Sequence, residues 1–257
     1  MNHTGQNQET NAVLKRLAAR ALGLTGADIQ RIVKEAKAAA RRHGRPLALA
    51  DLEAGIRHHR PQLSPERLRD TAVHEAGHLI VHHVLDLGPI RGVTIDDASG
   101  GGYGSLGFDT RQFTRRDWFE DMLTMLLAGR AAEALIFLEA GTGAGGTDDS
   151  DLARATEIAF AIERTLGIGQ KFPLLYRPHP RPAVVLDADP VLAARVHGHL
   201  ERAEERAGRL ITDNRRAFDT LVEALVDAQA LDGADVVRIL DQAGVVSQGR
   251  FAEAGVE

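Results

Sequence analysis

The spacing of apolar positions predicts that the chain begins with three helices. Residues 12–22 place an apolar side chain about every 3.6 positions, as an amphipathic helix does. A second helix is predicted over 25–44, because Thr25 and Asp28 have the spacing of a capping box and would bond its first free N–H groups. A short third helix is predicted over 50–59. We expect these three helices to form one small module.

A second module is predicted to start where prolines interrupt the pattern, between residues 60 and 64. Ser64 is a good helix cap and Pro65 suits the first helical position, so the stretch from 64 to 85 is predicted to be a helix. Residues 90–96 then alternate apolar and polar as a strand does. The glycines of SGGGYG predict a turn, and SLGFD at 105–109 the returning strand of a hairpin.

The rest of the chain is predicted to be helices joined by loops. One helix is expected to run from Thr114, with Asp117 three residues on, to about residue 134. The glycine-rich loop GTGAGGTDDS follows, and Ser150 caps the next helix. After a proline-rich surface loop, PLLYRPHPRPA, helices are predicted over 190–212, 214–229 and 233–243. The predicted fold class is therefore mainly α with one β-hairpin.

The composition agrees with an ordinary folded protein. The chain has 257 residues, of which 44% are apolar and 26% charged, enough to bury a sizeable core. The polar start lacks the profile of a signal peptide. No run of about 18 apolar residues occurs, so we do not expect this chain to span a membrane by itself.

Charge is distributed unevenly along the chain, which supports the division into two modules. Residues 1–70 carry a net charge of +6, and the remainder carries -11. A basic helical module raises the alternative that residues 1–60 bind DNA. Against this, the positive charges are spread around the predicted helices, and no second DNA-binding signature accompanies them. The prediction is therefore that the protein has no nucleic-acid partner.

The residues that carry chemistry lie on the helix predicted from Ser64. The chain has no cysteine, so a metal ion would have to be held by histidine or carboxylate side chains. His74 and His78 are four residues apart and project from one helix face, one turn apart. Glu75 projects about 100° away, beside the metal rather than on it, where it can act as a general base. The alternative is a helix face that is merely polar.

A zinc site of this kind needs a third protein ligand and an open fourth position. His82 continues the spacing but lies about 12 Å along the helix from His74, too far to share the ion. The remaining candidates are all carboxylates, namely Glu133, Glu139, Asp148, Asp149 and Asp151. Position favours Asp151, which a glycine-rich loop delivers to a helix N-terminus. Spacing alone leaves the choice open.

Four segments in register give the chain a family resemblance. HEAGH, LLAGRAAEALIF, SDLARATEIA and LITDNRRAFDTLVEALVDAQALDGADVVRIL together resemble the peptidase domain of FtsH-type ATP-dependent zinc metalloproteases over residues 64–243. The resemblance implies that Zn²⁺ is held by His74, His78 and Asp151, with Glu75 as the catalytic base. The loop before Asp151 is longer than in that family, which keeps Asp149 as the alternative third ligand. The predicted peptidase domain covers 64–245, followed by a tail at 246–257.

The resemblance also extends upstream. LGLTGADIQRIVKEAKAAARRHGRPLALADLEAGI is similar to the helical lid of the AAA ATPase module in the same family, so residues 1–60 are expected to be lid-like. It implies that Gly26 and Ala27 contact a nucleotide. No G-x-x-x-x-G-K-[ST] phosphate loop occurs in the chain, so ATP would act only through an AAA module absent from it. We therefore interpret the chain as part of a larger protease.

The resemblance further implies partners and a location. The intact enzyme is expected to be a homohexamer that degrades unfolded polypeptides. Substrate would pair with the hairpin's second strand at Leu106, Gly107 and Phe108, where a glycine leaves room for a close backbone approach. This chain is expected to be cytoplasmic, and the full-length protein is a candidate for membrane anchorage facing the cytoplasm. The rival interpretation is a scaffold of the same fold with a weak or empty zinc site.

Overall fold

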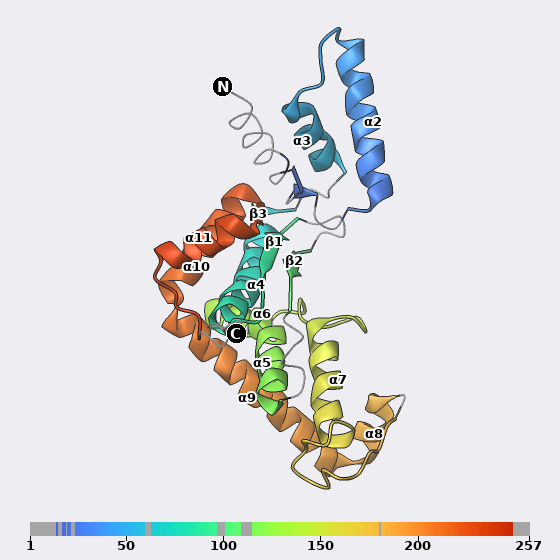
Figure 1. The fold of residues 1–257 in the computed structure, drawn as a ribbon, viewed down its shortest axis with the longest axis vertical. Helices are drawn as coiled ribbons and strands as arrows, with labels where there is room; N and C mark the ends of the chain where they lie inside the picture. Colours follow the sequence, from blue (N-terminus) through green and yellow to red (C-terminus); the bar gives the residue numbers. More distant parts are fainter. Residues whose placement is uncertain are drawn as a thin grey trace, which may run out of the picture. The chain divides into compact units, whose positions relative to one another are not determined.

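The computed structural model describes residues 14, 17–18, 20–21, 24–59, 63–96, 101–108, 115–179 and 181–248. These residues form helices and one small antiparallel sheet, which confirms the predicted mainly α class (Figure 1). The elements are α2 (Gly26–Arg42), α3 (Leu49–His58), α4 (Pro65–Val84), β1 (Ile90–Thr94), β2 (Tyr103–Leu106), α5 (Arg116–Leu126), α6 (Ala128–Phe137), α7 (Asp151–Arg164), α8 (Pro182–Ala188), α9 (Pro190–Asp213), α10 (Arg215–Ala228), β3 (Ala230–Asp232) and α11 (Gly233–Gln242). The helix predicted over 12–22 and the predicted tail lie largely outside the described residues.

Side-chain caps set several helix starts where the sequence predicts them. Thr25 and Asp28 form the reciprocal capping box of α2. The backbone N–H of Arg67 donates to Ser64 Oγ at the start of α4. Ser150 Oγ accepts from the N–H of Ala153 at the start of α7. These local bonds explain why the helix starts could be predicted from short motifs.

The helix predicted from 114 to 134 is in fact two helices. α5 ends at Leu126 and α6 begins at Ala128, with Leu127 between them at φ -90° and ψ 0°. The predicted cap, Thr114, lies outside the described residues, and Arg115 at the N-cap makes no side-chain cap bond. The last two residues of the predicted proline-rich loop, Pro182 and Ala183, begin a short helix, α8, that was not predicted.

The sheet has one more strand than predicted. β1 and β2 form the expected antiparallel hairpin, but β2 starts at Tyr103 and ends at Leu106, earlier than the predicted 105–109. β3 pairs antiparallel with the other side of β1, so the strand order is β2-β1-β3. Among the described residues, β2 is therefore an edge strand.

The chain divides into two compact units, each assembled from segments that are distant in sequence. Unit 1 comprises 1–75, 89–107 and 219–244, and unit 2 comprises 76–88, 108–218 and 245–257. The predicted module boundary at 60–64 stays a prediction. Within the described residues, none of the helices combines the length and apolarity that crossing a bilayer requires.

Each unit has its own buried residues. In unit 1, α2 lies beside α3, and α11 packs on β1 (Figure 1). The approach of α11 is close, because a Cβ built on Gly233 would overlap with Ile90 O. In unit 2, the long helix α9 packs along α5, α6 and α7. The fully buried side chains of unit 2 include Leu123, Leu126, Ile162, Leu192 and Ile211. α4 is one continuous helix that contributes residues to both units.

Candidate metal centre

Helix α4 carries both histidines of the H-E-x-x-H motif. The helix runs unbroken from Pro65 to Val84, so His74 and His78 are one turn apart on the same face, as predicted. Glu75 and His78 are each only 8% exposed. The motif is therefore buried with the helix rather than displayed to solvent on a polar face.

Gly77 of the same motif lets a second helix approach α4 closely. A Cβ at this position would stand 2.5 Å from Ala128 O and 2.8 Å from Ala132 Cβ, both on α6. These distances are far shorter than van der Waals contact, so a side chain cannot fit between the two helices. The small residue thereby fixes the path of α4 next to the two histidines.

The orientation of the His78 ring is set by a hydrogen bond to α5. His78 Nδ1 lies 2.8 Å from the carbonyl oxygen of Met125. A carbonyl oxygen can only accept, so Nδ1 carries the hydrogen in this bond, and Nε2 of the neutral ring presents a lone pair. Metal-binding histidines typically donate their second ring N–H in this way.

Asp151 is the first residue of α7, and the loop before it is held by its own bonds. The N–H of Leu152 donates to Ala144 O, and Ser150 Oγ donates to Thr147 O. Asp151 Oδ2 then lies 3.2 Å from His78 Nε2. Two ligands of one tetrahedral zinc ion, each bound at about 2.0–2.1 Å, are separated by about 3.3 Å, so this separation suits a shared ion.

The structure brings three of the predicted residues together. The ligand atoms of His74, His78 and Asp151 all lie within 4.8 Å of one another. Within the described part of the chain, this is the group of histidine and acidic side chains close enough to hold one metal ion. Two imidazoles and one carboxylate are one of the donor sets that hold zinc in catalytic sites.

The alternative third ligands have other roles. Asp149 Oδ1 accepts a 2.6 Å bond from Thr147 Oγ1, which is the largest cause that lowers the pKa of Asp149. Glu133 Oε2 accepts from the N–H of Gly141 at 2.7 Å, tying the end of α6 to the loop that follows. Glu139 and Asp148 are exposed. The geometry thus favours Asp151 over every carboxylate that spacing had left open.

His82 lies apart from the cluster, in keeping with its predicted exclusion. Nε2 donates to Gly88 O at 3.1 Å, and the ring packs edge-on against Phe108 at 5.3 Å. Nδ1 is buried without a partner among the described atoms. Burial lowers the pKa of His82 to about 4, so the ring is neutral at pH 7.

Glu75 faces the hairpin. Gly102 lies just before β2 and Gly104 lies within it. Cβ atoms built on these two glycines would stand at contact distance from the Glu75 side chain or closer. Sequence reasoning did not single out these two glycines, although their alternation in GGYG is the signal that could have found them. It chose Gly107 instead, which approaches a different neighbour: its N–H donates to Pro89 O, and its Cβ would stand 2.8 Å from Pro89 Cγ. The predicted substrate strand at 106–108 stays a prediction.

The remaining predicted contact residues, Gly26 and Ala27, open α2 and are exposed. Nothing lies within 4 Å of a Cβ built on Gly26, so this helix start has space for a ligand. The nucleotide contact itself stays a prediction.

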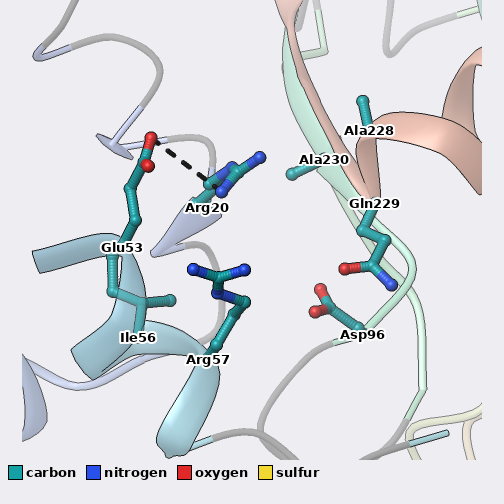
Figure 2. Close-up of a pocket in the computed structure, with 8 residues that line it drawn as sticks. All are labelled: Arg20, Glu53, Ile56, Arg57, Asp96, Ala228, Gln229 and Ala230. Atoms are coloured by element: carbon teal, nitrogen blue, oxygen red, sulfur yellow. Dashed lines mark ion pairs between the residues drawn. The ribbon is translucent and has the colours of Figure 1, made fainter. Parts of the chain in front are cut away.

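A separate pocket in unit 1 is too small to be a substrate site. Its volume is about 20 Å³, room for about one water molecule. Figure 2 shows Glu53 on one side and Asp96 on the other, with two arginines between them, and Arg20 lies 3.9 Å from Glu53. The pocket is lined by Arg20, Glu53, Ile56, Arg57, Asp96, Ala228, Gln229 and Ala230. Its charges are balanced, so it does not compete with the α4 cluster as an active site.

Comparison with known proteins gives a consistent set of matches. The profile of peptidase family M41 matches residues 61–239. Proteins named ATP-dependent zinc metalloprotease FtsH are similar to the chain: that of Thermotoga maritima is 30% identical over 89% of this chain and 41% of its own length. That of Methylibium petroleiphilum is 33% identical over 93% and 42%. FtsH 3 of Sphaerobacter thermophilus is 35% identical over 88% and 48%. The chain thus spans less than half the length of these relatives.

Proposed function

Because the chain belongs to peptidase family M41, whose profile covers more than half of it, we propose that it is the cutting part of an ATP-dependent zinc protease. The resemblance drawn from its motifs is thereby confirmed. The single observation that carries the proposal is the convergence of His74, His78 and Asp151 on one another beside the first turns of α7. The comparisons give no support to the alternative that residues 1–60 bind DNA.

The three side chains fit zinc by chemistry as well as by spacing. Two neutral imidazoles and a carboxylate suit this ion, and three protein ligands leave a fourth position open, as a catalytic site requires. The Met125 carbonyl favours the His78 tautomer whose Nε2 can bind a metal. When bound, zinc would supply Lewis-acid chemistry, lowering the pKa of a coordinated water towards about 7 and polarising the substrate carbonyl.

Glu75 would move the protons. It follows His74 directly on α4, so its carboxylate lies beside the ligands without being one of them. In peptide hydrolysis, Glu75 would accept a proton from the attacking water and later pass it to the amine that leaves. Its low exposure favours this role, because solvent does not compete for the carboxylate.

Unfolded polypeptides are the substrate class that the sheet favours. Among the described residues β2 lies at an edge of the sheet, so its outer backbone groups can pair with an extended chain. Backbone pairing is indifferent to side-chain identity, as degradation of varied unfolded proteins demands. Glu75 lies against β2, which would put a paired substrate near the catalytic base.

The larger assembly is proposed from the relatives. Their names describe ATP-dependent enzymes, and we assign ATP hydrolysis to an AAA module of the full-length protein, with Gly26 and Ala27 near the nucleotide. A homohexamer that feeds unfolded chains to the peptidase completes this proposal. Membrane anchorage of the full-length protein, with the peptidase facing the cytoplasm, belongs to the same proposal.

The test is cleavage of casein, an unstructured protein that needs no unfolding motor, with zinc and without ATP. The comparison is between the wild-type chain and Glu75→Gln, which keeps the size of the side chain but removes its basicity. We expect cleavage by the wild type to fall about 10²-fold or more in the variant, while both proteins bind about one zinc per chain. Equal cleavage by both proteins would refute the role of Glu75. Bound zinc with no cleavage by either would favour the scaffold alternative.

A further inference from the structure

Two glycines of the hairpin lie directly against the Glu75 side chain. A Cβ built on Gly102 would stand 2.6 Å from Glu75 Cγ and 2.7 Å from Cδ, with Oε1 closer still. A Cβ built on Gly104 would stand 3.3 Å from Oε2. Both carboxylate oxygens of Glu75 therefore face a stretch of hairpin backbone that has no side chain on that side.

Gly102 is needed for space rather than for its backbone conformation. The described glycines with φ in the left-handed region are Gly44, Gly88, Gly146, Gly167 and Gly244, and Gly102 is not among them. An alanine could therefore adopt the backbone of Gly102 without strain. What an alanine could not do is share its space with Glu75.

The two glycines differ in which part of Glu75 they meet. The position of Cγ is fixed by the helix backbone and χ1 alone, so moving it away from a new methyl group requires another rotamer. The contact at Gly104 involves Oε2, the far end of the side chain, which can shift by a few tenths of an ångström. A methyl group at position 102 would thus force the Glu75 side chain into another rotamer, whereas one at position 104 would shift only the carboxylate, and only slightly.

We propose that Gly102 is a positioning residue for Glu75: its missing side chain leaves the space for the rotamer in which the Glu75 carboxylate faces the backbone of Gly102 and Gly104. The catalytic part of this statement rests on the proposed function, whereas the steric part does not. Gly102 then acts through Glu75.

The steric part is tested by thermal unfolding of metal-free protein, so that zinc occupancy plays no role. Gly102→Ala is expected to lower Tm by about 4–8 °C, the usual effect of overpacking in a chain of this size. The same substitution made together with Glu75→Ala, which removes Cγ, is expected to cost less than about 2 °C. Gly104→Ala is the matched control and is expected to cost clearly less than Gly102→Ala. A loss of Tm that persists without Cγ, or no loss at all, would overturn the proposal.

The catalytic part is tested by the kinetics of casein cleavage. Gly102→Ala is expected to lower kcat about 10²-fold at unchanged KM and unchanged zinc content, because the base is misplaced while the ligands and the strand edge remain. Added to Glu75→Gln, it is expected to cause no further loss. An unchanged kcat in Gly102→Ala, with Glu75→Gln inactive, would overturn the positioning role alone. Full activity in Glu75→Gln would instead refute the proposed function and leave the unfolding test to decide the steric part. If Gly102→Ala by itself does not fold, recovery of folding by Glu75→Ala supports the proposal and continued failure overturns it.

Discussion

The buried ring of His82 should make the stability of this protein depend on pH in a defined window. Its pKa is lowered by burial to about 4 in the folded chain, compared with 6.5 for an exposed histidine. The folded state therefore binds fewer protons than the unfolded state between these two values. By linkage, stability is fully present above pH 6.5 and is lost as the pH falls towards 4.

The size of the effect follows from the two pKa values. Between pH 7 and pH 5, the difference in proton binding amounts to about 2 kcal/mol of unfolding free energy. His82 is wholly buried, so screening by solvent does not reduce this figure much. The unpartnered Nδ1 has the same consequence: a proton placed there would be buried without an acceptor.

Urea unfolding of metal-free protein at pH 7 and pH 5 measures the effect. We expect His82→Gln, which can keep a bond to Gly88 O, to be less stable than the wild type at pH 7. Between pH 7 and pH 5, however, its free energy of unfolding should fall by about 2 kcal/mol less than that of the wild type. His197→Gln is the matched control for replacing a histidine by glutamine, because the side chain of His197 is 69% exposed. The other ionisable groups are common to all three proteins, so their contributions cancel in the comparison. Equal pH dependence in wild type and His82→Gln would refute the reasoning.

Two further outcomes are expected. Asp151→Ala should reduce the zinc content from about one ion per chain to near zero, because two histidines alone bind the ion weakly, whereas Asp149→Asn should retain the zinc. Equilibrium dialysis against buffered zinc measures the zinc content of both variants. The opposite pattern would make Asp149 the ligand. Gly77→Ala should lower the free energy of unfolding by about 1–3 kcal/mol through overpacking against α6, whereas Gly145→Ala, whose Cβ would have 4.0 Å of space, should be close to neutral in the same urea experiment.

Local motifs made much of this structure predictable. The caps at Thr25, Ser64 and Ser150 act over three residues, so a short stretch of sequence contains the whole interaction. That His74 and His78 project from the same face of the helix likewise follows from helix geometry alone. The resemblance added the choice of Asp151, which spacing by itself could not make.

The features that were missed depend on neighbours that are distant in sequence. β3 has three residues, which are too few to show the alternation of apolar and polar positions that marks a strand. It forms because its backbone pairs with the free side of β1. Residues 121–129 are all buried and mostly apolar, so the apolar periodicity does not reveal the break between α5 and α6. The need for a glycine at 102 arises from Glu75, and at 107 from Pro89. A sequence pattern reveals a glycine, but it does not reveal which neighbouring atom occupies the space that a side chain would take.

The late position of β3 has a consequence for how the protein is made. The metal ligands and the hairpin are complete once residue 151 has been synthesised, but the strand that flanks β1 on its other side comes from residues 230–232. A two-stranded hairpin is marginally stable in water without a third strand or a packed helix. Some eighty further residues must therefore be synthesised after the last metal ligand before the three-stranded sheet beside Glu75 can form. Proteolytic competence would then arise only after residues 230–232 have been synthesised and β3 has paired with β1.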